Sequence, residues 1–282
     1  MILLPRLRIR SRRRTSTTNK VSEESKDQEQ LAGEMSFWDH LEVLRGTLFR
    51  SILYVCLAAV VCFSLKDLMF KVVFYPADAD FFLYRFLHWK VNVNLINTDV
   101  VAQFFVHLKV ACLVGLVLVF PLVIWEIWKF IAPALYEKEK KIVRGAFILA
   151  SVLFYLGVAC GYFFVLPVCL QFFMNYSVGE NVTNMINLNS YISLFISMVF
   201  MIGLVFEFPS VIAVLSRFGV VTKDVLRKYR KHAFVVVLIL AALITPADPL
   251  SMFVLAIPLY GLYEFSITQC KNPVLDKEED EE

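Results

Sequence analysis

Three carboxylates stand in surroundings that could give them a chemical role. Glu207 lies in the apolar run Leu204–Pro209, where an ionised side chain is costly and is therefore a functional candidate. The same surroundings are equally compatible with a hydrogen-bonded structural residue that faces a neighbouring helix. Glu139 lies in the lysine-rich stretch 137–141, and Glu42 lies just before the first long apolar run. Composition alone makes both of these solvated surface charges.

The other chemistry-bearing residues do not form a catalytic or metal-binding set. The sequence contains no HExxH, GxSxG or phosphate-binding glycine motif. Its six cysteines form no CxxC pair, and we interpret them as small apolar residues. The four histidines are far apart in the chain: His40, His88, His107 and His232. We therefore expect neither an enzyme nor a metal, cofactor or nucleic-acid site.

Long apolar runs are the elements that must position these residues. Hydrophobic types make up 59% of the 282 residues and charged types only 19%, whereas soluble domains have about a quarter charged. Runs of about 20 apolar residues are typical of membrane-spanning helices, which satisfy their own backbone groups in lipid. We predict an all-α integral membrane protein with six spans, at about residues 46–65, 104–128, 145–175, 188–216, 233–247 and 249–268.

The predicted spans differ in length. Residues 145–179 carry no charge, so this helix must tilt, kink at Pro167 or project beyond a hydrocarbon core about 30 Å thick. The charge-free runs 233–247 and 249–263 are short, at about 22 Å of helix each. A tight turn at Thr245–Pro249 should join them, because proline cannot continue a helix. Two short spans predict a locally thin membrane.

The distribution of Lys and Arg sets the orientation. The loop 129–144 carries five of them and the loop 217–231 carries six, whereas 174–190 carries none. Basic loops stay on the cytoplasmic side, so we expect both termini to be cytoplasmic. Residues 1–35 read as a disordered basic and polar tail, and 271–282 as an acidic tail around the membrane domain 36–270. An organelle transit peptide, or a start at Met35, are alternatives for the first segment.

Four charged residues near span ends can be interpreted without assigning them a function. Glu126 and Glu264 are expected to be interfacial charges, and Arg50 and Lys109 are expected to extend their charged groups towards the headgroups. Before the first span, Leu41, Leu44 and Leu48 share a helix face at spacings of three and four. The simplest interpretation of that segment is an amphipathic helix on the membrane surface.

Five segments, in order and on this layout, resemble the TatC family of twin-arginine protein translocase subunits. The likeness covers residues 36 to 269. The segments are His40–Arg45, Phe130–Tyr136 leading to Glu139, Phe206–Pro209, Thr245–Asp248, and Ala256–Tyr260 leading to Glu264.

The resemblance implies a concave six-helix scaffold that acts as receptor and core subunit of the translocase. Such a subunit binds twin-arginine signal peptides and exports folded proteins with the proton-motive force. The resemblance makes Glu139 a partner of the arginine pair, because carboxylates accept bidentate bonds from guanidinium groups. The other implied signal-peptide contacts are Leu41, Glu42, Arg45, Phe130 and Pro133.

The resemblance also implies partners and a location. Leu243, Thr245 and Asp248 would contact the single-span subunits TatA and TatB, in a complex that also contains a homo-oligomer of this chain. Glu207 would be the polar residue inside the fourth span. The location would be the bacterial inner membrane, with a thylakoid or mitochondrial membrane as the alternative.

The chain departs from the family pattern at two positions. The family usually carries its first glutamate where this chain has Val43, and Glu42 precedes it. One residue turns a side chain about 100° around a helix, so Glu42 points elsewhere unless the helix adjusts. Met252 replaces a glutamine found in some members.

Two other function classes fit the membrane layout. A proton- or ion-coupled solute transporter would use Glu207, but it predicts paired broken helices at the midplane, which the sequence does not indicate. An intramembrane enzyme would need catalytic residues that the motifs do not supply.

Overall fold

A computed structural model describes residues 37–89, 91, 93–132, 137–177, 179, 184–217, 219–245 and 249–270. The chain forms two compact units, residues 1–48 and 49–282, and each is described by itself. The helix α2 (Phe37–Ser64) begins in the first unit and continues into the second. In the first unit Leu41, Glu42, Leu44 and Arg45 are exposed on α2, while Val43 is half-buried.

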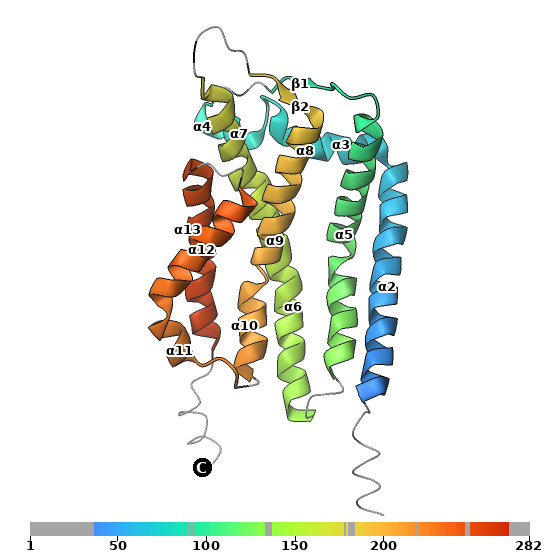
Figure 1. Ribbon diagram of the computed structural model, residues 1–282, viewed down its shortest axis with the longest axis vertical. Helices are drawn as coiled ribbons and strands as arrows, with labels where there is room; N and C mark the ends of the chain where they lie inside the picture. Colours follow the sequence, from blue (N-terminus) through green and yellow to red (C-terminus); the bar gives the residue numbers. More distant parts are fainter. Residues whose placement is uncertain are drawn as a thin grey trace, which may run out of the picture. The chain divides into compact units, whose positions relative to one another are not determined.

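The second unit is built from helices that pack side by side (Figure 1). Lipid offers no partners for backbone groups, so long apolar segments become helices. The longest helices are α5 (Ala102–Ile131), α6 (Glu137–Cys160), α12 (Arg230–Ile244) and α13 (Pro249–Gln269). Shorter helices are α7 (Leu166–Asn175), α8 (Leu188–Ile196), α9 (Ile202–Val205), α10 (Phe208–Arg217) and α11 (Lys223–Lys228).

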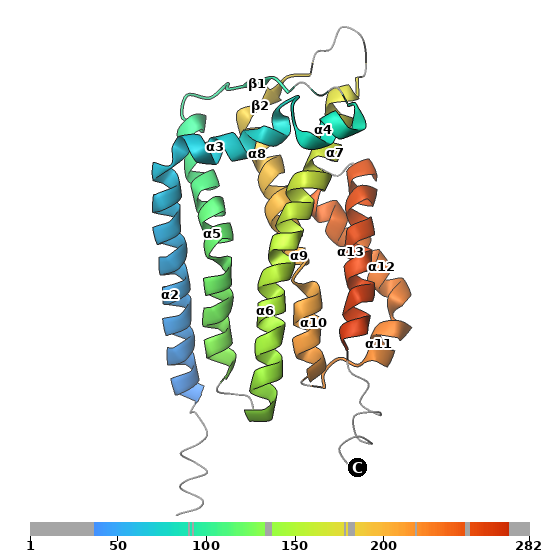
Figure 2. The ribbon, with the colours of Figure 1, turned by 180° about the vertical axis from the view of Figure 1, so that it is seen from behind.

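A small cap covers one end of this unit, where Figures 1 and 2 place it away from α11. It consists of α3 (Lys66–Phe74), the 3₁₀ turn η1 (Tyr75–Ala77), α4 (Phe82–Leu87) and the parallel strands β1 (Leu95–Ile96) and β2 (Ile186–Asn187). Tyr84 is buried there and donates a hydrogen bond of 2.9 Å to the Pro76 carbonyl. Burial raises the pKa of Tyr84, so its phenol stays protonated.

The third predicted span is one continuous helical segment from α6 to α7, with the π-helix η3 (Gly161–Val165) between them. Pro167 has no N–H for the carbonyl of residue 163, and the wider π turn immediately before it absorbs this break. A second π-helix, η4 (Ser197–Met201), follows α8 and packs against η3. A Cβ at Gly161 would collide with the Met198 carbonyl oxygen, so the two segments touch through their backbones.

Five helical segments in the described residues are long and apolar enough to cross a membrane: Leu41–Ser64, Ala102–Ile131, Arg144–Asn175, Leu188–Ser216 and Pro249–Gln269. The predicted bounds 249–268 of the last span agree with α13 to one residue, but the expectation of a short span from the charge-free run 249–263 is wrong, because α13 has 21 residues, or about 31 Å of helix. Its charged residue Glu264 does not end the helix, since Arg230 and Tyr260 satisfy the carboxylate. The neighbouring α12 has 15 residues and is short, as predicted.

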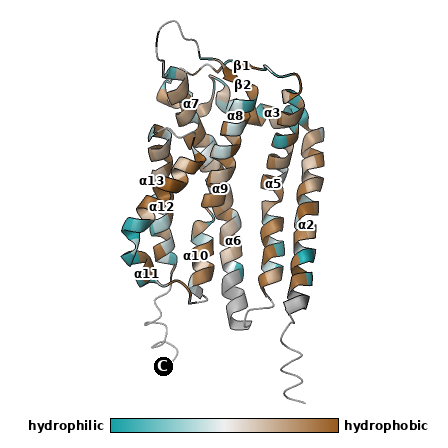
Figure 3. Ribbon diagram, in the orientation of Figure 1, coloured by the Kyte–Doolittle hydropathy of each residue, from teal (hydrophilic) through white to brown (hydrophobic). Residues whose placement is uncertain are grey.

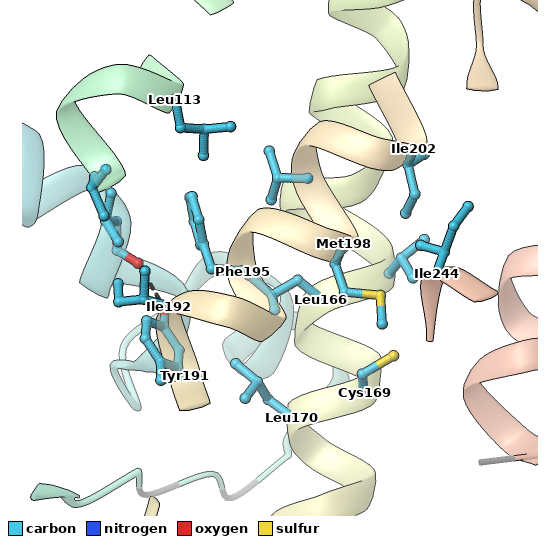
Figure 4. Close-up of a cluster of buried hydrophobic side chains, with 14 of the residues drawn as sticks. Leu113, Leu166, Cys169, Leu170, Tyr191, Ile192, Phe195, Met198, Ile202 and Ile244 are labelled. Atoms are coloured by element: carbon cyan, nitrogen blue, oxygen red, sulfur yellow. Dashed lines mark hydrogen bonds between the residues drawn. The ribbon is translucent and has the colours of Figure 1, made fainter. Parts of the chain in front are cut away.

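The main core lies where α7, α8 and η4 meet (Figure 4). The figure shows side chains from these elements pointing towards one another, with Ile244 of α12 beside them. Cys169 is a buried member of this core. The interpretation of the cysteines as small apolar residues fits Cys62, Cys169 and Cys270, which are buried, whereas Cys56 and Cys112 are exposed.

Candidate functional site

A buried carboxylate joins α2 to α5 within the second unit. Glu126 is 1% exposed and accepts hydrogen bonds from two cations. Arg50 Nε donates to its Oε2 at 2.7 Å, and Lys129 Nζ donates to its Oε1 at 2.7 Å. The sequence interpretation of both residues as isolated charges is wrong, because Glu126, expected at the interface, and Arg50, expected to extend towards the headgroups, pair with each other. A buried carboxylate needs such partners, because burial without them costs several kcal/mol.

Close packing reinforces this junction. A Cβ at Gly115 of α5 would lie 2.7 Å from the backbone nitrogen of Ala59, so the glycine allows α2 and α5 to approach closely. Tyr155 of α6 donates a hydrogen bond of 3.1 Å to the Val117 carbonyl of α5. The C-terminal half of α5 is thus held by its neighbours on both sides.

Aromatic contacts fix the start of α6 against the end of α5. The rings of Trp128 and Phe147 are 5.4 Å apart. The Arg144 guanidinium lies 5.4 Å from the ring centroid of Trp125, at the distance of a cation–π interaction. The link between α5 and α6, which contains the segment leading to Glu139, is therefore anchored at both of its ends.

The predicted signal-peptide residues fall into three groups. Glu139 lies in the first turn of α6, where the structure describes the backbone alone, and Phe130 is half-buried in the last turn of α5. Pro133 lies outside the described residues. Leu41, Glu42 and Arg45 are exposed on α2 in the first unit. Their roles in binding stay predictions.

Glu207 is placed at a break in the fourth predicted span. It follows α9 and precedes α10, and its half-buried carboxyl has one buried oxygen, Oε1, without a hydrogen-bond partner among the described residues. Its backbone still joins the two helices, because its N–H donates to Leu204 and its carbonyl accepts from Val211. The functional role predicted for Glu207 stays a prediction.

The predicted partner-contact residues lie at the end of α12. Leu243 is 76% exposed, and the Thr245 hydroxyl is buried and donates to the Ala241 carbonyl at 3.0 Å. A cavity of about 640 Å³ beside them is also lined by Ser190, Ser193 and Ser197 of α8 and η4. Asp248 lies outside the described residues. Met252 is partly buried against the main core, so it acts there as an apolar residue.

Sequence reasoning missed the cluster of Arg50, Glu126 and Lys129. The available signal was the position of Arg50 and Glu126 near the ends of two consecutive spans. Arg50 is near the start of the first span and Glu126 is near the end of the second. Because consecutive spans run antiparallel, these two ends lie on the same side of the membrane. Lys109, also expected to reach the headgroups, instead donates a hydrogen bond of 3.2 Å to Asn189.

A family model described as Sec-independent protein translocase protein (TatC) matches residues 39–258. The chain belongs to the TatC family. A TatC of Blattabacterium is 36% identical over 250 residues, which cover 83% of this chain and 94% of the relative. The TatCy protein of Bacillus subtilis is 32% identical over 236 residues, covering 83% and 88%.

Solved structures agree with this TatC assignment. A crystal structure titled as the twin-arginine translocase receptor TatC, in the detergent DDM, aligns with a TM-score of 0.69 and 31% identity. The alignment covers 82% of this chain and 99% of that one. The predicted family, the helical membrane fold and the absence of an enzymatic class are confirmed, since TatC is a family of protein translocase receptors. This TatC-family chain is a multi-pass protein of the bacterial inner membrane.

Proposed function

We propose that this translocase subunit receives the arginine pair of a signal peptide at the start of α6, with Glu139 as the charged acceptor. The observation that supports this proposal is the anchoring of the preceding link. Glu126 is clamped by Arg50 and Lys129, and Arg144 stacks on Trp125, so both ends of the link are held. A recognition segment held at both ends loses less conformational freedom when a peptide binds.

The chemistry favours arginine over lysine. A guanidinium group donates two parallel hydrogen bonds to one carboxylate, whereas an ammonium group acts as a point charge. Each such charge-assisted bond contributes about 1.5–3 kcal/mol. The resemblance adds Leu41, Glu42 and Arg45 of the first unit, together with Phe130 and Pro133, as further contacts. Folded cargo would then cross the membrane with the proton-motive force.

The proposal includes six spans and cytoplasmic termini. The short helix α12 is the additional span, although its 15 residues give about 22 Å of helix. Basic residues support the orientation: α11 and the start of α12 carry Lys223, Arg227, Lys228, Arg230 and Lys231 at the end of the unit opposite the cap. The positive-inside rule assigns that end to the cytoplasm.

The proposed partners are the single-span subunits TatA and TatB, further copies of this chain, and membrane lipid. Exposed Leu243 at the end of α12 supports a partner contact, because an apolar side chain there is available to a neighbouring helix in lipid. The serines beside it offer hydrogen-bond donors and acceptors for such a helix. A short α12 also suits partners whose own helices are short.

Photocrosslinking to the signal peptide tests the proposed acceptor. A photoreactive group beside the arginine pair should crosslink to residues 137–144, and Glu139→Ala should weaken the crosslink about tenfold. Glu137→Ala is the matched control, because it removes an equal charge from the same turn. Equal weakening by both variants would mean that net charge, and not Glu139, attracts the peptide. No loss with Glu139→Ala would refute the assignment.

A further inference from the structure

An apolar cavity of about 370 Å³ lies among α10, α11, α12 and α13. This volume is within the range of pockets that bind small organic ligands, about 300–1,000 Å³. Its walls come from all four helices, with Ile212, Leu226, Val236 and Leu259 among them. Its lining residues include none from the start of α6 and none that line the serine-rich cavity at the far end of α12.

Two polar contacts fix the positions of the helices around this cavity. The Tyr263 hydroxyl of α13 donates a hydrogen bond of 2.6 Å to the Leu226 carbonyl of α11. Arg230 at the start of α12 pairs with Glu264 of α13 at 2.7 Å. These bonds tie both α11 and α12 to α13. The cavity therefore has fixed walls at the corner where α11 turns into α12.

The cavity reaches the exposed surface of α12, the helix proposed above as the additional span. Val236 and Leu240 line it and are 53% and 36% exposed. Along α12, the lining residues run from Tyr229, just before the helix, to Leu240, which corresponds to about 16 Å of helix. That length matches half of a hydrocarbon core about 30 Å thick, and thus the depth of one leaflet.

The end of the cavity nearest α11 is basic. Arg227, Lys228 and Lys231 are exposed, and within the described residues no carboxylate is ion-paired to them. Tyr229 and His232 line the cavity there, with their rings 5.5 Å apart. Figure 3 shows the change from a hydrophilic corner at α11 to a hydrophobic α12. Asp224 is the acidic residue of the first turn of α11.

From this combination we propose that the corner is a binding site for one anionic phospholipid. An acyl chain lies in the apolar cavity along α12, and the phosphate lies at the basic end with Lys228, Lys231 and the Tyr229 hydroxyl. An anionic headgroup fits because a zwitterionic one brings its own cation to a site already rich in cations. Its position in the cytoplasmic leaflet rests on the orientation proposed above, whereas the site itself does not.

Native mass spectrometry of the full-length chain in detergent tests the site. Dioleoyl phosphatidylglycerol should bind in preference to dioleoyl phosphatidylcholine, which has the same acyl chains. Lys228→Gln with Lys231→Gln should lower that preference by about fivefold for each cation removed. The matched control is Lys71→Gln with Arg85→Gln, which removes the same charge near the cap and should leave the preference unchanged.

A second variant distinguishes lipid binding in the cavity from general electrostatic attraction of anionic lipid to basic residues. Val236→Trp fills the cavity from its exposed edge and keeps every charge, so it should abolish the tightly bound phosphatidylglycerol. Unchanged binding in Val236→Trp, or an equal loss in the control pair, would overturn the proposal. Binding that appears only after residues 271–282 are deleted would also overturn it, because the acidic tail would then be the occupant.

Discussion

Breaking the contact between Arg50 and Glu126 should release α2 from α5. The carboxylate side chain is 2% exposed, whereas those of Arg50 and Lys129 are 46% and 50% exposed. Charge-assisted hydrogen bonds contribute about 1.5–3 kcal/mol when shielded, and the half-exposed cations reduce this to about 1 kcal/mol each. Glu126→Gln should therefore lower the free energy of unfolding by about 2 kcal/mol.

Arg50→Gln should cost more per bond removed, at about 2–3 kcal/mol. It leaves the buried carboxylate with Lys129 of its own helix, and an incompletely paired buried charge costs more than the lost attraction. Reversible unfolding in mixed detergent micelles measures both variants and the double variant. If the contact is real, the double variant costs about 1 kcal/mol less than the two single changes together.

Strict additivity in that cycle would refute the ion pair. Arg85→Gln provides the control for removal of an exposed cation, and it should stay within about 0.5 kcal/mol of the parent chain. The same variants also report on function. Loss of the clamp should weaken signal-peptide crosslinking to the start of α6, because the link from α5 is then less ordered.

Two further predictions follow from the packing of α5 and from the length of α12. Gly115→Ala should destabilise the chain by about 1–3 kcal/mol in the same unfolding assay, because its Cβ would meet the Ala59 backbone, whereas Gly261→Ala should not destabilise it, since nothing lies within 4 Å of its Cβ. An insertion of one apolar turn into α12 should impair export of a folded reporter and leave signal-peptide crosslinking intact, if a short helix is required for partner recruitment or local thinning of the membrane. Equal export with the longer helix would refute that requirement.

The membrane spans were predictable because each depends on local composition. Apolar runs gave the positions of α5, of the fourth span Leu188–Ser216 and of α12 to within a few residues of their observed ends. The third span was predicted to tilt, kink at Pro167 or project beyond the membrane, and the structure places the π-helix η3 directly before Pro167. The pair β1 and β2 was not predicted, since two-residue strands leave no periodicity in the sequence.

The charged residues were harder to place, because their surroundings depend on which helices become neighbours. Glu126 and Arg50 are 76 positions apart, and the antiparallel order of their spans places them on one side of the membrane without indicating that they pair. Glu264 was interpreted as an interfacial charge near the end of the last span, but sequence alone did not indicate that Arg230 from another helix pairs with it. The candidate role of Glu139 came from family resemblance, since its surroundings read as an ordinary basic surface.

Binding of a signal peptide to the purified full-length chain tests the central claim most directly. Fluorescence anisotropy would compare one labelled peptide with its arginine pair intact against the same peptide with both arginines changed to lysine. We predict that the lysine peptide binds at least tenfold more weakly, and that Glu139→Gln removes most of this difference. Equal affinity of the two peptides for the parent chain would contradict recognition of the arginine pair by a carboxylate.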